Sequence, residues 1–140
     1  MIKNFEELKH KATLLKNNRL ANRNSFERGT YSVGIVNNKN GKRISISKLL
    51  AKRLGLTDCV DIVALEEDNI ILLGKNLPFN DVKVTCKVSG DDKKIVYNSQ
   101  LVQDLSEIFA IDYKGQTSRA FSEVSIHVDN NTVMAAVVIK

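Results

Sequence analysis

Five basic residues lie close together in the first half of the chain: Lys42, Arg43, Lys48, Lys52 and Arg53. Lysine and arginine neutralise phosphate groups, and an arginine can also contact two acceptor atoms on the edge of a guanine base. A solvated basic face on a small domain would have the same composition. The stretch therefore predicts a nucleic-acid-binding site, with a solvated face as the alternative.

The N-terminal segment carries further basic residues on a predicted amphipathic helix. Asn4 and Glu7 have the spacing of a capping box, which places this helix at about residues 4–20. Its apolar stripe consists of Phe5, Leu8, Ala12 and Leu15, with Lys9, Lys11 and Lys16 opposite. The basic series continues with Arg19, Arg23 and Arg28. These cations could follow a nucleic-acid backbone, whereas the stripe favours packing on the domain or dimerisation.

Charge is distributed unevenly along the 140-residue chain. Residues 1–57 contain 13 Lys+Arg and 3 acidic residues, whereas residues 58–140 contain 8 Lys+Arg and 13 acidic residues. The basic half favours a polyanionic partner, although a basic solvated tail would give the same balance. The acidic half could mask nucleic acid or bind a protein. We therefore expect double-stranded DNA as the main partner, and a protein partner of the acidic half stays open.

Residues suited to catalysis are few. His10 lies on the basic helix and His127 in a predicted strand, and no Walker-type, GxGxxG or HExxH motif occurs. Cys59 and Cys86 form no CxxC pair, so we expect buried, reduced thiols. The sequence predicts a protein that is not an enzyme and that holds neither a metal ion nor a cofactor.

The basic stretch is predicted to lie on a strand and a short helix. Arg43 to Ile46 alternates polar and apolar residues, as a half-buried strand does. Ser47 can cap a helix over residues 48–54, and Gly55 can end it. A hairpin over residues 60–65 and 69–73 follows, and a strand over residues 31–36 precedes.

This order of elements is repeated in weaker form. The second copy comprises strands at residues 82–88 and 95–97, a helix at 99–108, and a hairpin at 123–128 and 133–139, with a loop at 112–118. Aligning Lys42-Arg43-Ile44 with Lys93-Lys94-Ile95 places Leu50 on Leu101 and Leu54 on Leu105. The C-terminal match, Val60 and Ile62 on Val124 and Ile126, needs about 13 extra residues in copy two. We expect two half-units that build one shared core.

The first copy resembles the AbrB-type swapped-hairpin family of bacterial regulators and antitoxins. The matching pieces are Gly34-Ile35-Val36, Gly41, Arg43, Ile46, Leu50, Leu54-Gly55-Leu56, Val60, Ile62, Ile70-Ile71-Leu72 and Lys75. In that family two chains interleave hairpins into one barrel-like DNA-binding unit, so the resemblance implies that the two copies here pair within one chain. By position it implies DNA contacts for Arg43 and Lys52, with Asn37 and Ala51 at the other reading positions. The corresponding residues in copy two are Lys94, Val102 and Gln103.

The expected fold is α+β: a small, mostly-β barrel of two strand–short helix–hairpin copies, preceded by an N-terminal helix. Residues 1–29 form the basic helix and arm, residues 30–77 copy one and residues 78–140 copy two. The expected function is DNA binding, as a transcriptional regulator of a bacterium, phage or mobile element. The alternative is a phage-type protein inhibitor that binds a nucleic-acid-handling enzyme. Because no signal peptide or membrane span is evident, we expect a cytoplasmic protein that could form a homodimer.

Overall fold

The computed structural model describes residues 31–129 and 131–139, and these residues form an α+β fold that is mostly sheet. The strands of copy one are β1 (Val33–Asn38), β2 (Gly41–Ile46), β3 (Cys59–Leu65) and β4 (Ile70–Gly74). Those of copy two are β5 (Val84–Lys87), β6 (Lys94–Val96), β7 (Ser118–Phe121), β8 (Val124–Asp129) and β9 (Thr132–Val138). The helices are α2 (Lys48–Leu54) and α3 (Ser99–Ile108), with a 3-10 turn η1 (Glu66–Asp68). Neither α2 nor α3 is long and apolar enough to cross a membrane.

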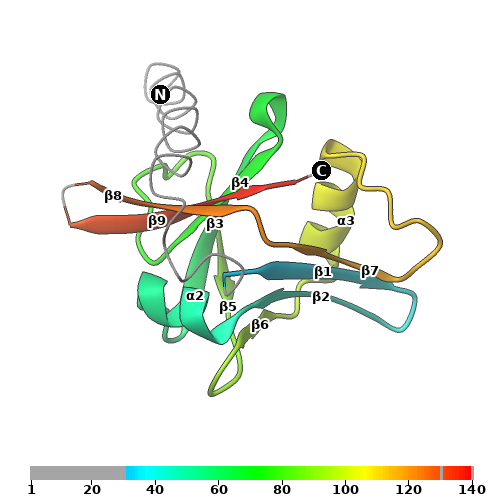
Figure 1. The fold of residues 1–140 in the computed structure, drawn as a ribbon, viewed down its shortest axis with the longest axis horizontal. Helices are drawn as coiled ribbons and strands as arrows, with labels where there is room; N and C mark the ends of the chain where they lie inside the picture. Colours follow the sequence, from blue (N-terminus) through cyan, green and yellow to red (C-terminus); the bar gives the residue numbers. More distant parts are fainter. Residues whose placement is uncertain (1–30, 130, 140) are drawn as a thin grey trace.

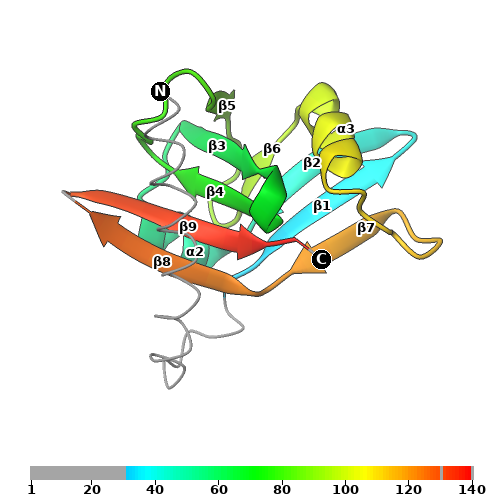
Figure 2. The same ribbon diagram turned by 90° about the horizontal axis from the view of Figure 1, so that it is seen from above.

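The strands form two antiparallel sheets. The smaller has the order β6-β2-β1-β7 and the larger the order β5-β3-β4-β9-β8 (Figure 1). Viewed from above, the helices α2 and α3 lie at opposite ends of this arrangement (Figure 2). Each sheet contains strands from both copies, so neither copy has a sheet of its own. Buried residues of both segments also meet in the main hydrophobic cluster.

The prediction of a barrel is wrong, because the two sheets do not join into one closed cylinder. Between β5 and β6 the only ladder contact of the described residues is the isolated bridge from Ser89 to Ile95. On the other side, β7 and β8 follow each other in the chain but belong to different sheets. The hydrogen-bonded ladder is interrupted at both places, and a closed barrel requires an uninterrupted one.

The main core lies between the sheets and is closed by the helices. From β2, Ile44 and Ile46 point into it, and from the helices come Leu50, Leu54, Leu101, Val102 and Leu105. α3 packs on β1 and β2, and α2 on β9. The leucines that the repeat aligns are thus buried in both helices, at the same helical spacing. Their burial stabilises the fold by about 2 kcal/mol for each fully buried side chain.

The helix ends differ from the expectation in one detail. α2 has the predicted bounds, and Gly55 ends it with a φ of 70°, a left-handed conformation that suits glycine. Ser47 does not cap α2 with its side chain; its Oγ accepts a hydrogen bond from the Ser32 N–H at 3.0 Å. The predicted cap is wrong because this hydroxyl connects the start of β1 to the end of β2. In α3 the cap is Asn98, which accepts from the Leu101 N–H at 3.0 Å.

The pairing of β4 with β9 joins strands of the two predicted C-terminal hairpins. Leu72 lies opposite Ala136, Ile70 opposite Val138 and Gly74 opposite Met134. Each opposed pair of an antiparallel ladder lies on a local two-fold axis, and the axis through Leu72 and Ala136 relates residues 64 positions apart. This offset equals the one that aligns the two C-terminal hairpins in the sequence.

The pairing of β2 with β6 joins one strand of each copy. Ser45 lies opposite Ile95, with Ile44 opposite Val96 and Ile46 opposite Lys94. Each opposed pair of an antiparallel ladder lies on a local two-fold axis, and the axis through Ser45 and Ile95 relates residues 50 positions apart. About this axis Arg43 is related to Lys93, whereas the sequence alignment places Arg43 on Lys94.

Strand β7 was not predicted, and it provides the fourth strand of the smaller sheet. Ser118 to Phe121 pair with β1, Val33 lying opposite Phe121. The expected loop at residues 112–118 therefore ends where β7 begins. Arg119 lies over the Phe121 ring at 5.1 Å and donates from Nη1 to the Asp112 carbonyl at 2.7 Å. β7 has only four residues and includes the charged Arg119, so its sequence lacks the alternation of polar and apolar residues that would predict a strand.

The segment after β4 is fixed by the buried carboxylate of Asp61 on β3. Asp61 accepts from the Leu77 N–H at 2.9 Å, Lys83 Nζ at 3.1 Å and Thr85 Oγ1 at 2.6 Å. Burial alone would raise the pKa of Asp61, but the hydrogen bonds from Thr85, Lys83 and Leu77 and the Lys83 charge hold it below its ordinary 3.8. The ionised Asp61 side chain thus connects β3, β5 and the loop between β4 and β5.

We expect Asp61→Ala to lower the free energy of unfolding by about 2 to 3 kcal/mol, because the Lys83 ammonium, the Thr85 hydroxyl and the Leu77 N–H would lose the buried carboxylate as an acceptor. Urea unfolding at pH 7 measures the change, and Asp81→Ala, an exposed residue of the same loop, should cost less than about 0.5 kcal/mol.

The Asp61 stabilisation should also depend on pH. Since the folded-state pKa lies below 3.8, the contribution is complete above that value and is lost as the pH falls below it. If Asp61→Ala and Asp81→Ala lowered the free energy of unfolding equally at pH 7, the stabilising role of the Asp61 carboxylate would be contradicted.

Candidate nucleic-acid interface

Arg43 lies on the outer face of β2. Side chains alternate along a strand, so the inward Ile44 and Ile46 direct Arg43 and Ser45 outward. Arg43 is exposed, and no hydrogen bond or ion pair joins it to another of the described residues. Its guanidinium can therefore bind an anion without first giving up an internal contact.

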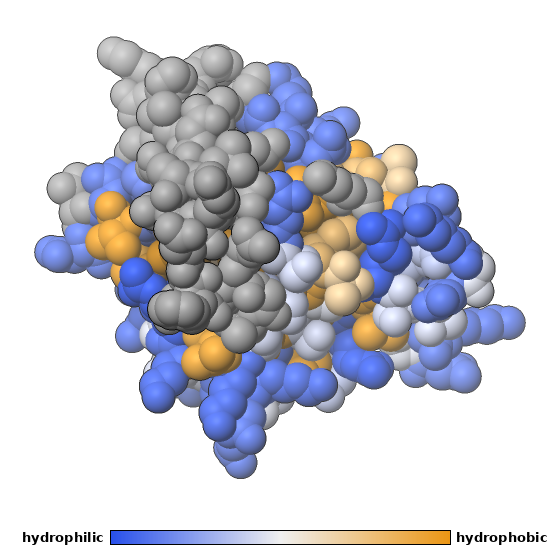
Figure 3. Space-filling view, viewed as in Figure 1, coloured by the Kyte–Doolittle hydropathy of each residue, from blue (hydrophilic) through white to orange (hydrophobic). Residues whose placement is uncertain are grey.

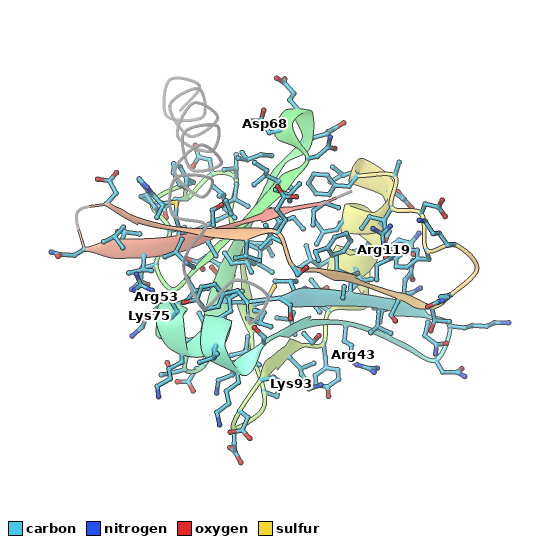
Figure 4. The ribbon with its side chains drawn as sticks, in the orientation of Figure 1. Arg43, Arg53, Asp68, Lys75, Lys93 and Arg119 are labelled. Atoms are coloured by element: carbon cyan, nitrogen blue, oxygen red, sulfur yellow. The ribbon has the colours of Figure 1, made fainter. Side chains whose placement is uncertain are left out.

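Lys93 directly precedes β6 and lies near the end of β2. If the β2–β6 register is extended by one residue, Lys93 lies opposite Ser47. Ser47 is four residues from Arg43, so Arg43 and Lys93 are about 13 Å apart along the strand direction. Both side chains are exposed, and they are labelled beside β6 in Figure 4. Two cations related by a local two-fold axis thus lie on one face of the strand pair.

An exposed aromatic residue lies beside these cations. Tyr97 follows β6, and by the same register it lies opposite Arg43. Its side chain is 68% exposed, the largest exposure among the large hydrophobic residues that the structure describes. A ring next to arginine and lysine can stack on a base or a sugar.

The helix α2 extends the basic surface beyond the end of β2. Lys48, Lys52 and Arg53 are exposed, while Leu50, Ala51 and Leu54 are buried on the opposite side of the helix. Lys48 Nζ lies 3.7 Å from Asp92 Oδ1, and both side chains are mostly exposed, so this ion pair contributes little to stability. The contact brings the start of α2 next to the turn that precedes Lys93.

Arg43, Lys48, Lys52, Arg53 and Lys93 are called the basic track below. It runs from the outer face of β2 and β6 to the exposed side of α2, and Figure 4 shows Arg43 and Arg53 well apart. In the space-filling view the surface over α2 and β6 is mostly hydrophilic (Figure 3). A shallow hollow of about 300 Å³ beside Lys52 and Arg53 is also lined by Tyr31 and Leu49.

Lys42 does not belong to the basic track, contrary to the predicted single cluster. Its Nζ donates to Asn37 Oδ1 at 2.5 Å, and Asn37 Nδ2 donates to Ser106 Oγ of α3 at 3.5 Å. Alternation along β2 separates the neighbours Lys42 and Arg43 onto opposite faces of the sheet. Lys42 therefore takes part in packing the first hairpin against α3. Arg19, Arg23 and Arg28, the other predicted contacts, lie outside the described residues.

The helix of copy two carries no counterpart of the α2 cations. In the helix alignment, Lys52 corresponds to Gln103 and Arg53 to Asp104. Gln100 Nε2 donates to Asp104 at 2.9 Å, and Gln103 Nε2 donates to Glu107 at 2.8 Å. The exposed side of α3 is thus polar and acidic. On the strands the cations Arg43 and Lys93 are related by a local two-fold axis, whereas of the helices α2 and α3 only α2 carries exposed cations.

The described residues contain no group of three His, Cys, Asp or Glu side chains placed to hold a metal ion. Cys59 and Cys86 are both free thiols, as expected, but Cys86 is buried and Cys59 only half-buried. Burial raises the pKa of the Cys86 thiol, which keeps it protonated and unreactive at neutral pH.

We expect Lys42→Met and Arg43→Met to differ in their effect on stability. Lys42→Met removes the partner of Asn37 and should lower the free energy of unfolding by about 1 kcal/mol. Arg43→Met should change it by less than about 0.5 kcal/mol. Urea unfolding of the two variants measures the difference, and a larger loss for Arg43→Met would refute the division of the two side chains between the faces.

Comparisons with known proteins give no relative for this chain. No protein-family model matches it, and neither a curated protein nor a solved structure is significantly similar.

Proposed function

We propose that this protein binds double-stranded DNA through the basic track. The observation that carries the proposal is the pair Arg43 and Lys93, two exposed cations that a local two-fold axis relates on the outer face of β2 and β6. A DNA duplex has local two-fold axes of its own, and DNA-binding proteins commonly match that symmetry. Cations about 13 Å apart can reach phosphates on both sides of one groove.

The proposal includes the arrangement that the AbrB-type resemblance implies. In that family, each half-unit comes from a separate chain. Here both half-units would be copies within one chain, joined by the strand pairs β2–β6 and β4–β9. Its role would be transcriptional control or another task on DNA. The two-fold surface would be presented by a single chain without dimerisation.

The helices suggest that the DNA site is not a perfect palindrome. Lys52 and Arg53 extend the basic track on the α2 side, whereas Gln103 and Asp104 offer no cation on the α3 side. Base contacts would then come from one half of the surface, and the other half would contribute the phosphate contact of Lys93. A cytoplasmic location follows from this function.

We expect Arg43→Ala/Lys93→Ala to weaken binding of duplex DNA and to reduce its salt dependence. Each lost phosphate contact should lower the slope of log affinity against log salt by about 0.9, so the double variant should lose about 1.8. Fluorescence anisotropy between roughly 50 and 200 mM salt measures this slope. The matched control is Lys87→Ala/Lys114→Ala, which removes the same charge from exposed sites outside the basic track.

Comparing the two double variants distinguishes DNA binding at the basic track from general attraction between DNA and a positively charged protein. Equal losses in the two double variants would show that only net charge matters and would refute the assigned surface. Absence of binding by the wild-type protein at the lower salt would refute DNA binding itself.

A protein partner is the second candidate function, as in a phage-type inhibitor of a nucleic-acid-handling enzyme. The observation in its favour is the exposed acidic side of α3, where Asp104 and Glu107 lie and where Asp104 corresponds to Arg53 of α2. In that case Asp104→Lys/Glu107→Lys should abolish capture of the enzyme while leaving DNA affinity unreduced.

A further inference from the structure

The larger sheet has two buried faces, and only one of them faces the main core. The second face is formed by alternate residues of β3, β4 and β9: Val63, Leu65, Ile70, Leu72, Met134, Ala136 and Val138. Each of these side chains is at most 6% exposed. A sheet face of this composition must be covered by other apolar groups.

The described residues cover only part of this second face. Leu77 is buried against it, Phe79 packs on it partly buried, and both belong to the loop that Asp61 fixes. The close approach of Leu77 to Gly74 places that loop at one end of β4. Among the described residues no other apolar side chain packs on the cluster from outside the sheet, so the central residues such as Leu72 and Ala136 need a further apolar cover.

We propose that the predicted amphipathic helix at residues 4–20 packs on this second face within the same chain. Its stripe of Phe5, Leu8, Ala12 and Leu15 would extend about 15 Å along the helix. Strands of five to seven residues such as β3, β4 and β9 are about 17 to 23 Å long. The apolar stripe and the apolar face are therefore of matching length.

The chain between the two is long enough for this contact. Ten residues (21–30) lie between Leu20 and Tyr31, and they can span about 35 Å when extended. A domain of 140 residues has a radius of gyration of about 14 Å. The helix can thus reach the second face from the start of β1 without a partner chain.

Charge favours the same contact. Glu66, Glu67 and Asp68 follow β3, and Glu123 lies at the same end of the sheet, since its carbonyl accepts from the Val138 N–H at 3.0 Å. Asp68 is labelled at that end in Figure 4. The predicted helix carries Lys9, Lys11 and Lys16 outside its stripe. The predicted helix would thus match the second face in two ways: its apolar stripe would lie on the apolar residues, and its lysines would lie near the acidic residues at the end of the sheet.

The first test uses the wild-type chain at low concentration. Carbodiimide cross-linking followed by peptide mass spectrometry should join lysines of residues 3–16 to Glu66, Glu67, Asp68 or Glu123 within monomers. Absence of these links, or their presence only in cross-linked dimers, would overturn the intrachain contact. The second outcome would assign the cover to another copy of the chain.

The second test uses Leu8→Gln/Leu15→Gln in the full-length chain. Uncovering the second face should raise the fluorescence of a bound apolar dye several-fold and accelerate amide hydrogen exchange in β9. The control is Thr13→Gln/Asn17→Gln, two neutral positions away from the stripe, which should change neither signal. Equal behaviour of the two variants would overturn the proposal, and if the stripe variant fails to fold, the cross-linking decides. Neither test depends on DNA binding.

Discussion

The antiparallel pairs β2–β6 and β4–β9 are the contacts on which the rest of the structure depends. Each pair joins a strand of copy one to its counterpart in copy two, and each has a register with a local two-fold axis. Because side chains alternate between the faces of a sheet, these registers decide which residues enter the core and which remain outside. The shared core and the outward position of Arg43 and Lys93 have this same origin.

Side-chain size and one buried carboxylate fix the register of the larger sheet. Apolar residues occupy both faces of β4 and β9, so a slip of one residue in their pairing would still bury apolar side chains. The exchange of small against large residues resists that slip, since Ala136 lies opposite Leu72 and Met134 opposite Gly74. Asp61 adds a polar constraint, because its three hydrogen bonds require the loop after β4 to follow one path.

The two copies have diverged where they meet solvent and not where they meet each other. Leu50 and Leu101, or Leu54 and Leu105, remain equivalent because both helices must fill the same kind of space. The exposed positions next to them differ in charge, with Lys52 and Arg53 on α2 against Gln103 and Asp104 on α3. Packing constrains the buried side of a helix, whereas the exposed side is constrained only by partners.

The sequence by itself determined the local elements and the repeat. Helices α2 and α3, both C-terminal hairpins and the buried leucines follow from periodicity and from Gly55. Tertiary structure decided the pairing of strands across the copies, since hydrogen-bonded neighbours such as Ser45 and Ile95 leave no local signal in either segment. It therefore also decided that Lys93 lies on the same face as Arg43, that Lys42 faces α3, that β7 joins β1 and that the sheets stay open. A one-residue shift between equally plausible alignments exchanges the two faces of a strand, and only the register of the folded chain distinguishes them.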